Sequence, residues 1–198
     1  MTDSLFLCYN IKKSMKLESC WQWEKGEIPD HICDYIVNNI NVELYEKGVT
    51  GFDRKINSER NVNIQFDNIN WINALLQGYI RYANFANFNY DLSDEDKESM
   101  QISRYSEGKF YKKHRDYTNT RESNAFTRKL SITVQLSDEN DYEGGDLIFY
   151  NSSDNNKAPR GKGSVIVFDS RLYHEVTPVT KGVRYSLVKW YHGDEPLK

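Results

Sequence analysis

The second half of the chain, from about residue 100, consists of short β-type runs separated by polar turns. The runs are rich in β-branched and aromatic residues, and turn-forming residues bound each of them. They read, in order, MQISRYS, KLSITVQLS, DLIFY, GSVIVFD, YHEVTPV and VRYSLVKWY. Many short strands at close spacing are typical of a sandwich or a barrel. We therefore predict a mainly β fold whose core lies in residues 100–191.

Two amphipathic segments precede these runs. Residues 28–48 have helix start signals in Pro29 and Asp30, a stop signal in Gly48, and apolar residues at helical spacing, namely Ile32, Ile36 and Ile40. Residues 68–86 place a second set on one helical stripe, namely Trp71, Leu75, Tyr79 and Tyr82. We predict two helices whose stripes pack on the β core. Residues 1–99 would then be a helical support region within a single domain, residues 1–198.

Composition excludes several classes of protein. The formal net charge of −3 and the pI of about 5.9 give no general attraction to nucleic acid or to anionic membranes. The chain has no apolar run of about 18 residues and no clear signal peptide, so we expect no membrane association. The three cysteines are odd in number and widely spaced. They indicate no disulfide framework, and we expect a cytoplasmic protein.

FYKKHRDY, residues 110–117, fits two competing motifs. His-Arg-Asp opens the catalytic loop of protein kinases, whereas His-x-Asp supplies two ligands of a three-ligand iron site. A kinase loop needs an Asn five positions after the Asp to hold magnesium, but Arg121 occupies that position. No Asp-Phe-Gly follows and no glycine-rich strand and loop precede the motif. The kinase interpretation therefore fails.

His114 and Asp116 are spaced for joint metal binding, because residues i and i+2 of a strand point to the same face. A surface His beside a solvated Asp would give the same pattern. His174, at the start of the YHEVTPV run, completes a set of two imidazoles and one carboxylate. That set leaves positions open on Fe(II) for a bidentate co-substrate and O2. A structural zinc site would use four ligands, usually including Cys, and no Cys is suitably placed.

Arg184 is a candidate anion-binding residue. It lies ten residues past His174, after the turn signal TKG, so it should return on the neighbouring antiparallel strand, deep in the barrel. Its planar guanidinium matches a carboxylate in a bidentate manner. Ser186 should point the same way and add a hydroxyl donor. A nearby Asp or Glu that neutralises Arg184 is the alternative.

The joint pattern of residues 100–191 resembles that of iron- and 2-oxoglutarate-dependent dioxygenases, in the prolyl 4-hydroxylase branch that includes the bacterial PKHD-type hydroxylases. The resemblance is carried, in order, by YSEGKFYKKHRD, RKLSITVQLSDENDYEGGDLIF, PRGKGSVIVF and HEVTPVTKGVRYSLVKW. Residues 1–99 have no clear match beyond helices that commonly support this barrel. The resemblance implies a double-stranded β-helix, or jelly roll, with two or more helices packed against it.

The resemblance also implies a set of site residues. His114, Asp116 and His174 would bind Fe(II), and Arg184 would bind the distal carboxylate of 2-oxoglutarate. Tyr105 would help to hold this co-substrate. The polar residues Ser131, Thr133 and Gln135 alternate with Leu130, Ile132, Val134 and Leu136, so we expect the polar set to face the site, with Gln135 and Ser186 touching the co-substrate. Gln135 stands where relatives often have an aromatic residue.

The implied reaction is the hydroxylation of an unactivated C–H bond with O2, releasing succinate and CO2, with ascorbate as reductant. The resemblance favours a proline in a protein or peptide as substrate, in a pocket lined by Tyr111, Arg128 and Trp190. Nucleic-acid demethylases usually carry a second Arg at the position of Trp190, so we expect no nucleic-acid partner. No sequence feature indicates an oligomeric state. The loops at 117–127 and 151–163 are expected to act as lids that select the substrate.

Three alternatives remain open at this point. The substrate could be a free amino acid or a small metabolite, because the metal site is indifferent to substrate size. The chain could be a catalytically silent jelly-roll binding module, although its ligand set is intact. A cupin-type metal site would need three His and a Glu, and we expect His192 to be a surface residue past the last strand.

Overall fold

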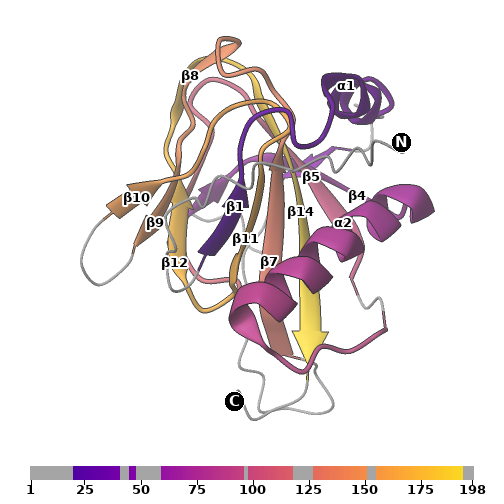
Figure 1. Ribbon diagram of the computed structural model, residues 1–198. Coiled ribbons are helices and arrows are strands. Elements are labelled where there is room, and N and C mark those ends of the chain that lie inside the picture. The colour runs from indigo at the N-terminus through magenta and orange to yellow at the C-terminus, as the bar shows by residue number, and fades with distance from the viewer. Residues whose placement is uncertain are drawn as a thin grey trace, which may run out of the picture.

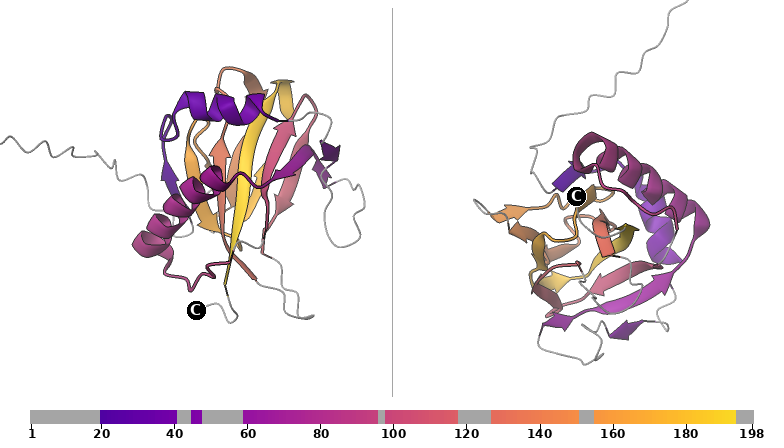
Figure 2. Two further views of the ribbon diagram at one scale, coloured as in Figure 1. Left: turned by 90° about the vertical axis from the view of Figure 1, so that its right-hand side faces the viewer. Right: turned by 90° about the horizontal axis from the view of Figure 1, so that it is seen from below.

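The computed structural model describes residues 20–40, 45–47, 59–95, 98–117, 127–150 and 155–193 (Figure 1). Two antiparallel sheets face each other, and helices pack on the outer side of the larger sheet (Figures 1 and 2). This is the predicted double-stranded β-helix with helical support. No helix in these ranges is both long enough and apolar enough to cross a membrane.

The larger sheet has the strand order β1-β11-β7-β14-β5-β4-β2. Its strands are β1 (Cys20–Trp23), β2 (Glu46–Lys47), β4 (Asn63–Asp67), β5 (Met100–Tyr105), β7 (Thr127–Gln135), β11 (Val165–Asp169) and β14 (Arg184–Gly193). The smaller sheet has the order β10-β9-β12-β6-β3. Its strands are β3 (Arg60–Asn61), β6 (Phe110–His114), β9 (Leu147–Tyr150), β10 (Asn155–Lys157) and β12 (Tyr173–Val176). A third pair joins β8 (Tyr142–Gly144) to β13 (Val179–Gly182).

Alternation along β7 gives the larger sheet two different faces. Every second residue is aliphatic and belongs to the core beneath the helices, namely Leu130, Ile132, Val134 and, just past the strand, Leu136. The residues between them are polar and buried on the opposite face, namely Ser131, Thr133 and Gln135. The register with β14 pairs Gln135 with Ser186 and Ser131 with Trp190, so these side chains share the inner face. The predicted orientation of the polar set is confirmed.

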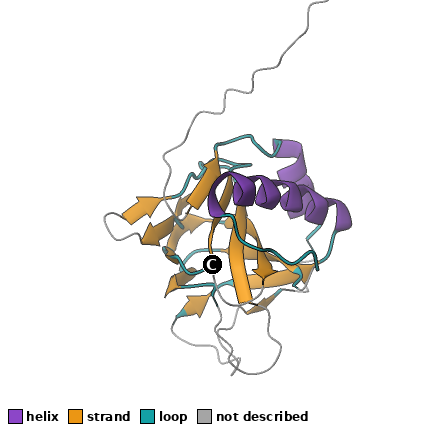
Figure 3. Cartoon of the chain, turned by 60° about the horizontal axis from the view of Figure 1, so that its bottom comes forward, coloured by secondary structure: helices purple, strands orange, loops and turns teal. Residues whose placement is uncertain are grey.

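Two helices cover the outer face of the larger sheet (Figure 3). Helix α1 (Asp30–Asn38) ends well before the predicted stop at Gly48, which lies outside the described residues. Helix α2 (Asn70–Ala83) continues into a π-helical turn, η2 (Asn84–Phe88). The structure also adds β1 to β4, strands from the region that the sequence marked as helical support.

The buried stripe of α2 differs from the predicted one. The predicted core stripe was Trp71, Leu75, Tyr79 and Tyr82. The fully buried residues are instead Ile72, Leu76, Ile80 and Ala83, and of the predicted set only Leu75 and Tyr79 pack, partly buried, against this core. Trp71 and Tyr82 are 43% and 45% exposed. The aromatic rings instead pack edge-on at the border of the helix, with the Tyr79 centroid 5.0 Å from that of Trp23. The compact aliphatic side chains fit the close approach of helix and sheet, and the polar-tipped rings stay at its edge.

A glycine turn between β8 and β9 makes room for the start of β14. Gly144 and Gly145 both have positive φ, +69° and +62°. A Cβ on Gly144 would lie 2.2 Å from the carbonyl oxygen of Pro178, and a Cβ on Gly145 would lie 3.2 Å from Cδ of Arg184. Only glycine meets both the conformational and the steric demands here. The acidic-Gly-Gly turn of the sequence therefore lets the Arg184 side chain pass into the barrel.

Candidate metal centre

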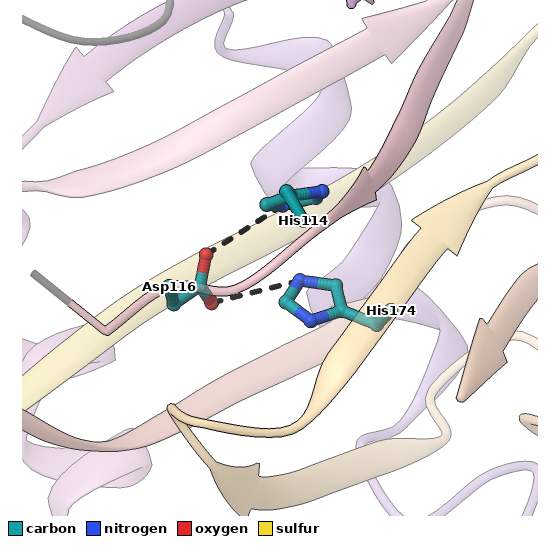
Figure 4. Close-up of side chains that lie close together, drawn as sticks. All are labelled: His114, Asp116 and His174. Atoms are coloured by element: carbon teal, nitrogen blue, oxygen red, sulfur yellow. Dashed lines mark ion pairs between the residues drawn. The ribbon is translucent and has the colours of Figure 1, made fainter. Parts of the chain in front are cut away.

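Two His and one Asp converge inside the barrel mouth (Figure 4). His114 ends β6 and is directly paired with His174 of the neighbouring strand β12, whereas Asp116 lies just past the end of β6. The Nε2 atom of His114 is 3.7 Å from Oδ1 of Asp116, and that of His174 is 3.8 Å from Oδ2. The ligand atoms of all three lie within 4.8 Å of one another. One ion can bind all three, as the sequence predicts.

Hydrogen bonds orient both imidazoles. Nδ1 of His114 lies 2.7 Å from the carbonyl oxygen of Lys112, and Nδ1 of His174 lies 2.9 Å from that of Leu172. A carbonyl only accepts, so Nδ1 carries the proton in each ring and donates it. Each Nε2 lone pair is then free for a metal.

Asp116 is held by a buried hydroxyl pair. Oγ of Ser131 donates to Oδ2 of Asp116 at 2.8 Å and lies 3.0 Å from Oγ of Ser170. Both serines are fully buried. The two hydroxyls therefore hold the Asp116 carboxylate in place.

The electrostatics of the site also suit a cation. Burial, with the nearby His174 as second cause, lowers the pKa of His114 to about 3, so this imidazole is neutral at neutral pH. Burial alone would raise the pKa of Asp116, but His174 and His114 outweigh it and hold that pKa below its usual value. Two imidazoles and one carboxylate form a donor set that suits Fe(II).

The metal centre lies in a cavity of about 1030 Å³ that also contains Arg184. Arg184 is 1% exposed. It donates from Nη2 to Oε1 of Gln135 at 2.9 Å, and its Nη1 is 3.4 Å from Oγ of Ser186. Its guanidinium carbon lies 5.3 Å from the ring centroid of Tyr105. The predicted co-substrate residues are thus brought together around one guanidinium.

Arg184 has the properties of an anion site rather than of an internal ion pair. Within the described ranges it forms no salt bridge with any Asp or Glu, so the predicted alternative of a neutralising carboxylate is not found there. Its Nε is buried without a hydrogen-bond partner. A buried cation left in this state is costly, and a ligand carboxylate would satisfy it. The residues present therefore fit 2-oxoglutarate.

The three predicted substrate residues line the same cavity, with Tyr111 on β6 of the smaller sheet and Arg128 and Trp190 on β7 and β14 of the larger one. The ring of Tyr111 stacks on His114, with centroids 3.5 Å apart and an interplanar angle of 13°. The guanidinium carbon of Arg128 lies 3.9 Å above the ring of Trp190. The indole Nε1 of Trp190 is buried and has no hydrogen-bond partner. These residues bring aromatic rings and a guanidinium to the lining of the cavity.

Three further residues join the site, and none of them was predicted to lie there. Glu98 accepts from Nε of Arg128 at 2.7 Å, and it comes from a charged stretch with no recognisable motif. Arg60 reaches in from β3, 4.6 Å from the ring centroid of Tyr111. The prediction that His192 is a surface residue past the last strand is wrong: it is 5% exposed and contacts Glu98. β14 runs on to Gly193, and a register shift beside His192 keeps it in the sheet.

Comparisons with known proteins came from sequence and from structure. Residues 100–192 match the family described as the 2OG-Fe(II) oxygenase superfamily. A PKHD-type hydroxylase from Idiomarina loihiensis is 33% identical over 91 residues, which are 46% of this chain and 40% of that protein. A PKHD-type hydroxylase from Synechococcus sp. strain CC9605 is 40% identical over 93 residues, again 46% of this chain and 40% of that protein. The matches thus span well under half the length of these relatives.

The similarity of fold extends over more of the chain. A prolyl-4-hydroxylase from Pseudomonas putida superposes with a TM-score of 0.69 at 17% identity, covering 89% of this chain and 94% of that one. A prolyl hydroxylase from Trichoplax adhaerens, solved with a hypoxia inducible factor peptide fragment, has a TM-score of 0.68 at 18% identity and covers 89% and 84%. At these identities the likeness establishes the double-stranded β-helix fold.

Proposed function

We propose that this protein is an Fe(II)- and 2-oxoglutarate-dependent dioxygenase that hydroxylates an unactivated C–H bond, because residues 100–192 match the 2OG-Fe(II) oxygenase superfamily. One observation carries the proposal: a single cavity holds both a three-ligand metal centre and a buried guanidinium that has no carboxylate partner within the described residues. The two features match the two parts of one cofactor system.

Two separate groups of residues would bind Fe(II) and 2-oxoglutarate. His114, Asp116 and His174 would hold Fe(II), and the distal carboxylate of 2-oxoglutarate would bind Arg184, with Ser186, Gln135 and Tyr105 beside it. When bound, iron and 2-oxoglutarate together activate O2, deliver one oxygen atom to the substrate and release succinate and CO2. Ascorbate would serve as the reductant that keeps iron ferrous.

Other residues of the cavity exclude water and fix geometry. Gln135 and Ser186 hold the guanidinium plane of Arg184, which sets the depth at which the co-substrate carboxylate binds. Apolar side chains line the space around the ligands, namely Leu147, Phe168 and Val176. Apolar side chains that exclude water strengthen the charge interactions inside the cavity and limit side reactions.

We propose a proline within a protein or peptide as the substrate. The aromatic rings of Tyr111 and Trp190 line the cavity that holds the metal centre, and such rings suit a compact, apolar pyrrolidine ring. The named activities of the P. putida and T. adhaerens proteins support this choice. A free amino acid or small metabolite is the alternative substrate, and a silent binding module is the alternative without catalysis. We propose no nucleic-acid partner, and the cytoplasmic location stays a prediction. The lid role of the loops at 117–127 and 151–163 also stays a prediction, because residues 118–126 and 151–154 lie outside the described residues.

The test is the mass of a proline-containing peptide after incubation with the protein, Fe(II), 2-oxoglutarate, ascorbate and O2. We expect a gain of one oxygen atom on proline, with one succinate formed per hydroxylation. Succinate formation that no peptide accelerates would overturn the prolyl substrate but keep the oxygenase. An absence of succinate with iron bound would instead favour the silent module.

A further inference from the structure

One wall of the cavity carries a cation that is already neutralised. Arg128 donates from Nε and Nη2 to the two carboxylate oxygens of Glu98, the first bond measuring 2.7 Å. Both side chains are largely buried, with 21% and 28% of their areas exposed. Glu98 also lies 2.6 Å from Nε2 of His192, and its backbone carbonyl accepts from Nζ of Lys189 at 2.9 Å. The carboxylate is therefore fixed from several sides.

Glu98 keeps its negative charge at any pH at which the protein would work. Burial alone would raise its pKa, but hydrogen bonds from His192 and Arg128 lower the pKa of Glu98 to about 2. The pair of Arg128 and Glu98 thus has no net charge near neutral pH.

The same wall can donate hydrogen bonds but offers no free anion site. The Nε1–H of Trp190 is buried without an acceptor, and the guanidinium of Arg128 lies over the indole ring. A buried donor in this state calls for an acceptor oxygen on the ligand. Arg184 provides the contrast, because its charge is not balanced by any carboxylate in the described part of the chain. Within the described residues, the cavity thus holds one guanidinium that a carboxylate neutralises, that of Arg128, and one that no carboxylate neutralises, that of Arg184.

We propose that Glu98 determines substrate specificity by cancelling the charge of Arg128, so that this wall accepts the neutral carbonyl of a peptide-embedded residue and discriminates against a free carboxylate. The proposal rests on the proposed function, since it assigns the substrate class of the same site. It favours the peptidyl substrate over the free amino acid.

A carboxylate and a neutral carbonyl would interact differently with the wall formed by Arg128, Glu98 and Trp190. An unbalanced guanidinium would attract a carboxylate through charge-assisted, bidentate hydrogen bonds. With Glu98 in place, an incoming carboxylate would meet no net positive charge and would lie beside a second carboxylate, which costs free energy in a largely buried site. A neutral carbonyl oxygen avoids that repulsion and still accepts from the wall.

The test uses two ligands that differ only in charge: acetyl-glycyl-alanyl-proline with a free carboxylate, and the same compound as its carboxy-terminal amide. Calorimetry gives the ratio of their affinities, and succinate formation gives the ratio of their kcat/KM values. Each ratio is taken within one variant, so a general loss of activity cancels. We expect the wild type to prefer the amide by about tenfold, since one hydrogen bond to a charged group is worth at least that factor.

A charge series makes the test specific. Glu98→Gln leaves Arg128 unbalanced and should shift the preference toward the acid by about tenfold. Arg128→Gln leaves Glu98 unbalanced and should increase the preference for the amide. The double variant is neutral again and should return to the wild-type ratio. His192→Gln keeps a side chain that can donate a hydrogen bond to Glu98 and leaves both Glu98 and Arg128 in place, so it serves as the matched control with an unchanged ratio.

The outcomes separate this inference from the proposed function. An equal ratio in the wild type and Glu98→Gln, or a wild type that prefers the acid, would overturn the role of Glu98. If Glu98→Gln does not fold, Arg128→Gln and the double variant decide the matter in the same way. Absence of any succinate with the expected affinity ratios would contradict the oxygenase but keep the charge rule. Failure of both peptides to bind would overturn the prolyl site.

Discussion

Replacement of Arg184 tests the co-substrate site most sharply. Arg184→Gln keeps much of the side-chain volume and removes the charge that, by our account, pairs with the distal carboxylate of 2-oxoglutarate. A buried hydrogen bond to a charged group contributes about 1.5–3 kcal/mol, and a guanidinium forms two with one carboxylate. A loss of about 3 kcal/mol corresponds to roughly a 150-fold weaker Kd for 2-oxoglutarate. Anaerobic calorimetry of 2-oxoglutarate binding to the metal-loaded protein measures this change.

The matched variant is Arg184→Lys, which keeps the charge and loses the planar fork. We expect it to weaken 2-oxoglutarate binding about tenfold, an intermediate effect, because a lysine ammonium binds a carboxylate as a point charge. Metal affinity should stay within about threefold in both variants, since the hydrogen bonds of Arg184 go to Gln135 and Ser186 rather than to a metal ligand, and effects between residues with no shared partner are usually small. Unchanged 2-oxoglutarate affinity in Arg184→Gln, or an equal loss of metal and co-substrate binding, would refute the assignment.

Three further predictions follow from the packing and the charges. Ser131→Ala removes the hydroxyl that donates to Asp116 and should weaken metal binding about 10- to 100-fold in a metal titration; an unchanged affinity would contradict its role. Leu76→Ala should lower the free energy of unfolding in urea by about 2–5 kcal/mol, because Leu76 is buried between α2 and the sheet. Trp71→Ala should lower it clearly less, because Trp71 is 43% exposed. Equal losses in the two variants would contradict the observed buried stripe of α2. Folding lowers the pKa of Glu98 to about 2, so its stabilisation is present above pH 4.5 and is lost as the pH falls toward 2. Glu98→Gln should therefore flatten the dependence of Tm on pH between 5 and 3, and an unchanged slope would count against the buried ion pair.

The inner face of the barrel could be predicted because a strand alternates with period two. Ser131 and Gln135 are polar residues among aliphatic ones, so the sequence alone determines that they share a face. The pairing of β7 with β14 then brings Ser186 opposite Gln135, which places both beside Arg184. His114 and Asp116 were predictable as a pair for the same reason, from their spacing of two residues, whereas His174 was added as the second imidazole at the start of a later β-type run.

Other features depend on contacts that local patterns do not contain. Helix α2 has two adjacent apolar stripes, and periodicity cannot decide between them; the close approach to the sheet selects the aliphatic one. Glu98 lies in a charged stretch that reads as a solvated loop, yet long-range contacts with Arg128 and His192 bury it. Strands β1 and β4 were missed because they are short and add to the sheet only through distant partners.

The decisive measurement for the proposed iron site is succinate formation from 2-oxoglutarate by the wild type and His174→Ala, each with Fe(II), ascorbate and O2. We expect iron-dependent succinate formation by the wild type, and neither iron binding nor succinate formation by His174→Ala, because the loss of one of three ligands leaves the ion without its facial set. Full turnover in His174→Ala, or no turnover in a wild type that demonstrably binds iron, would contradict the account.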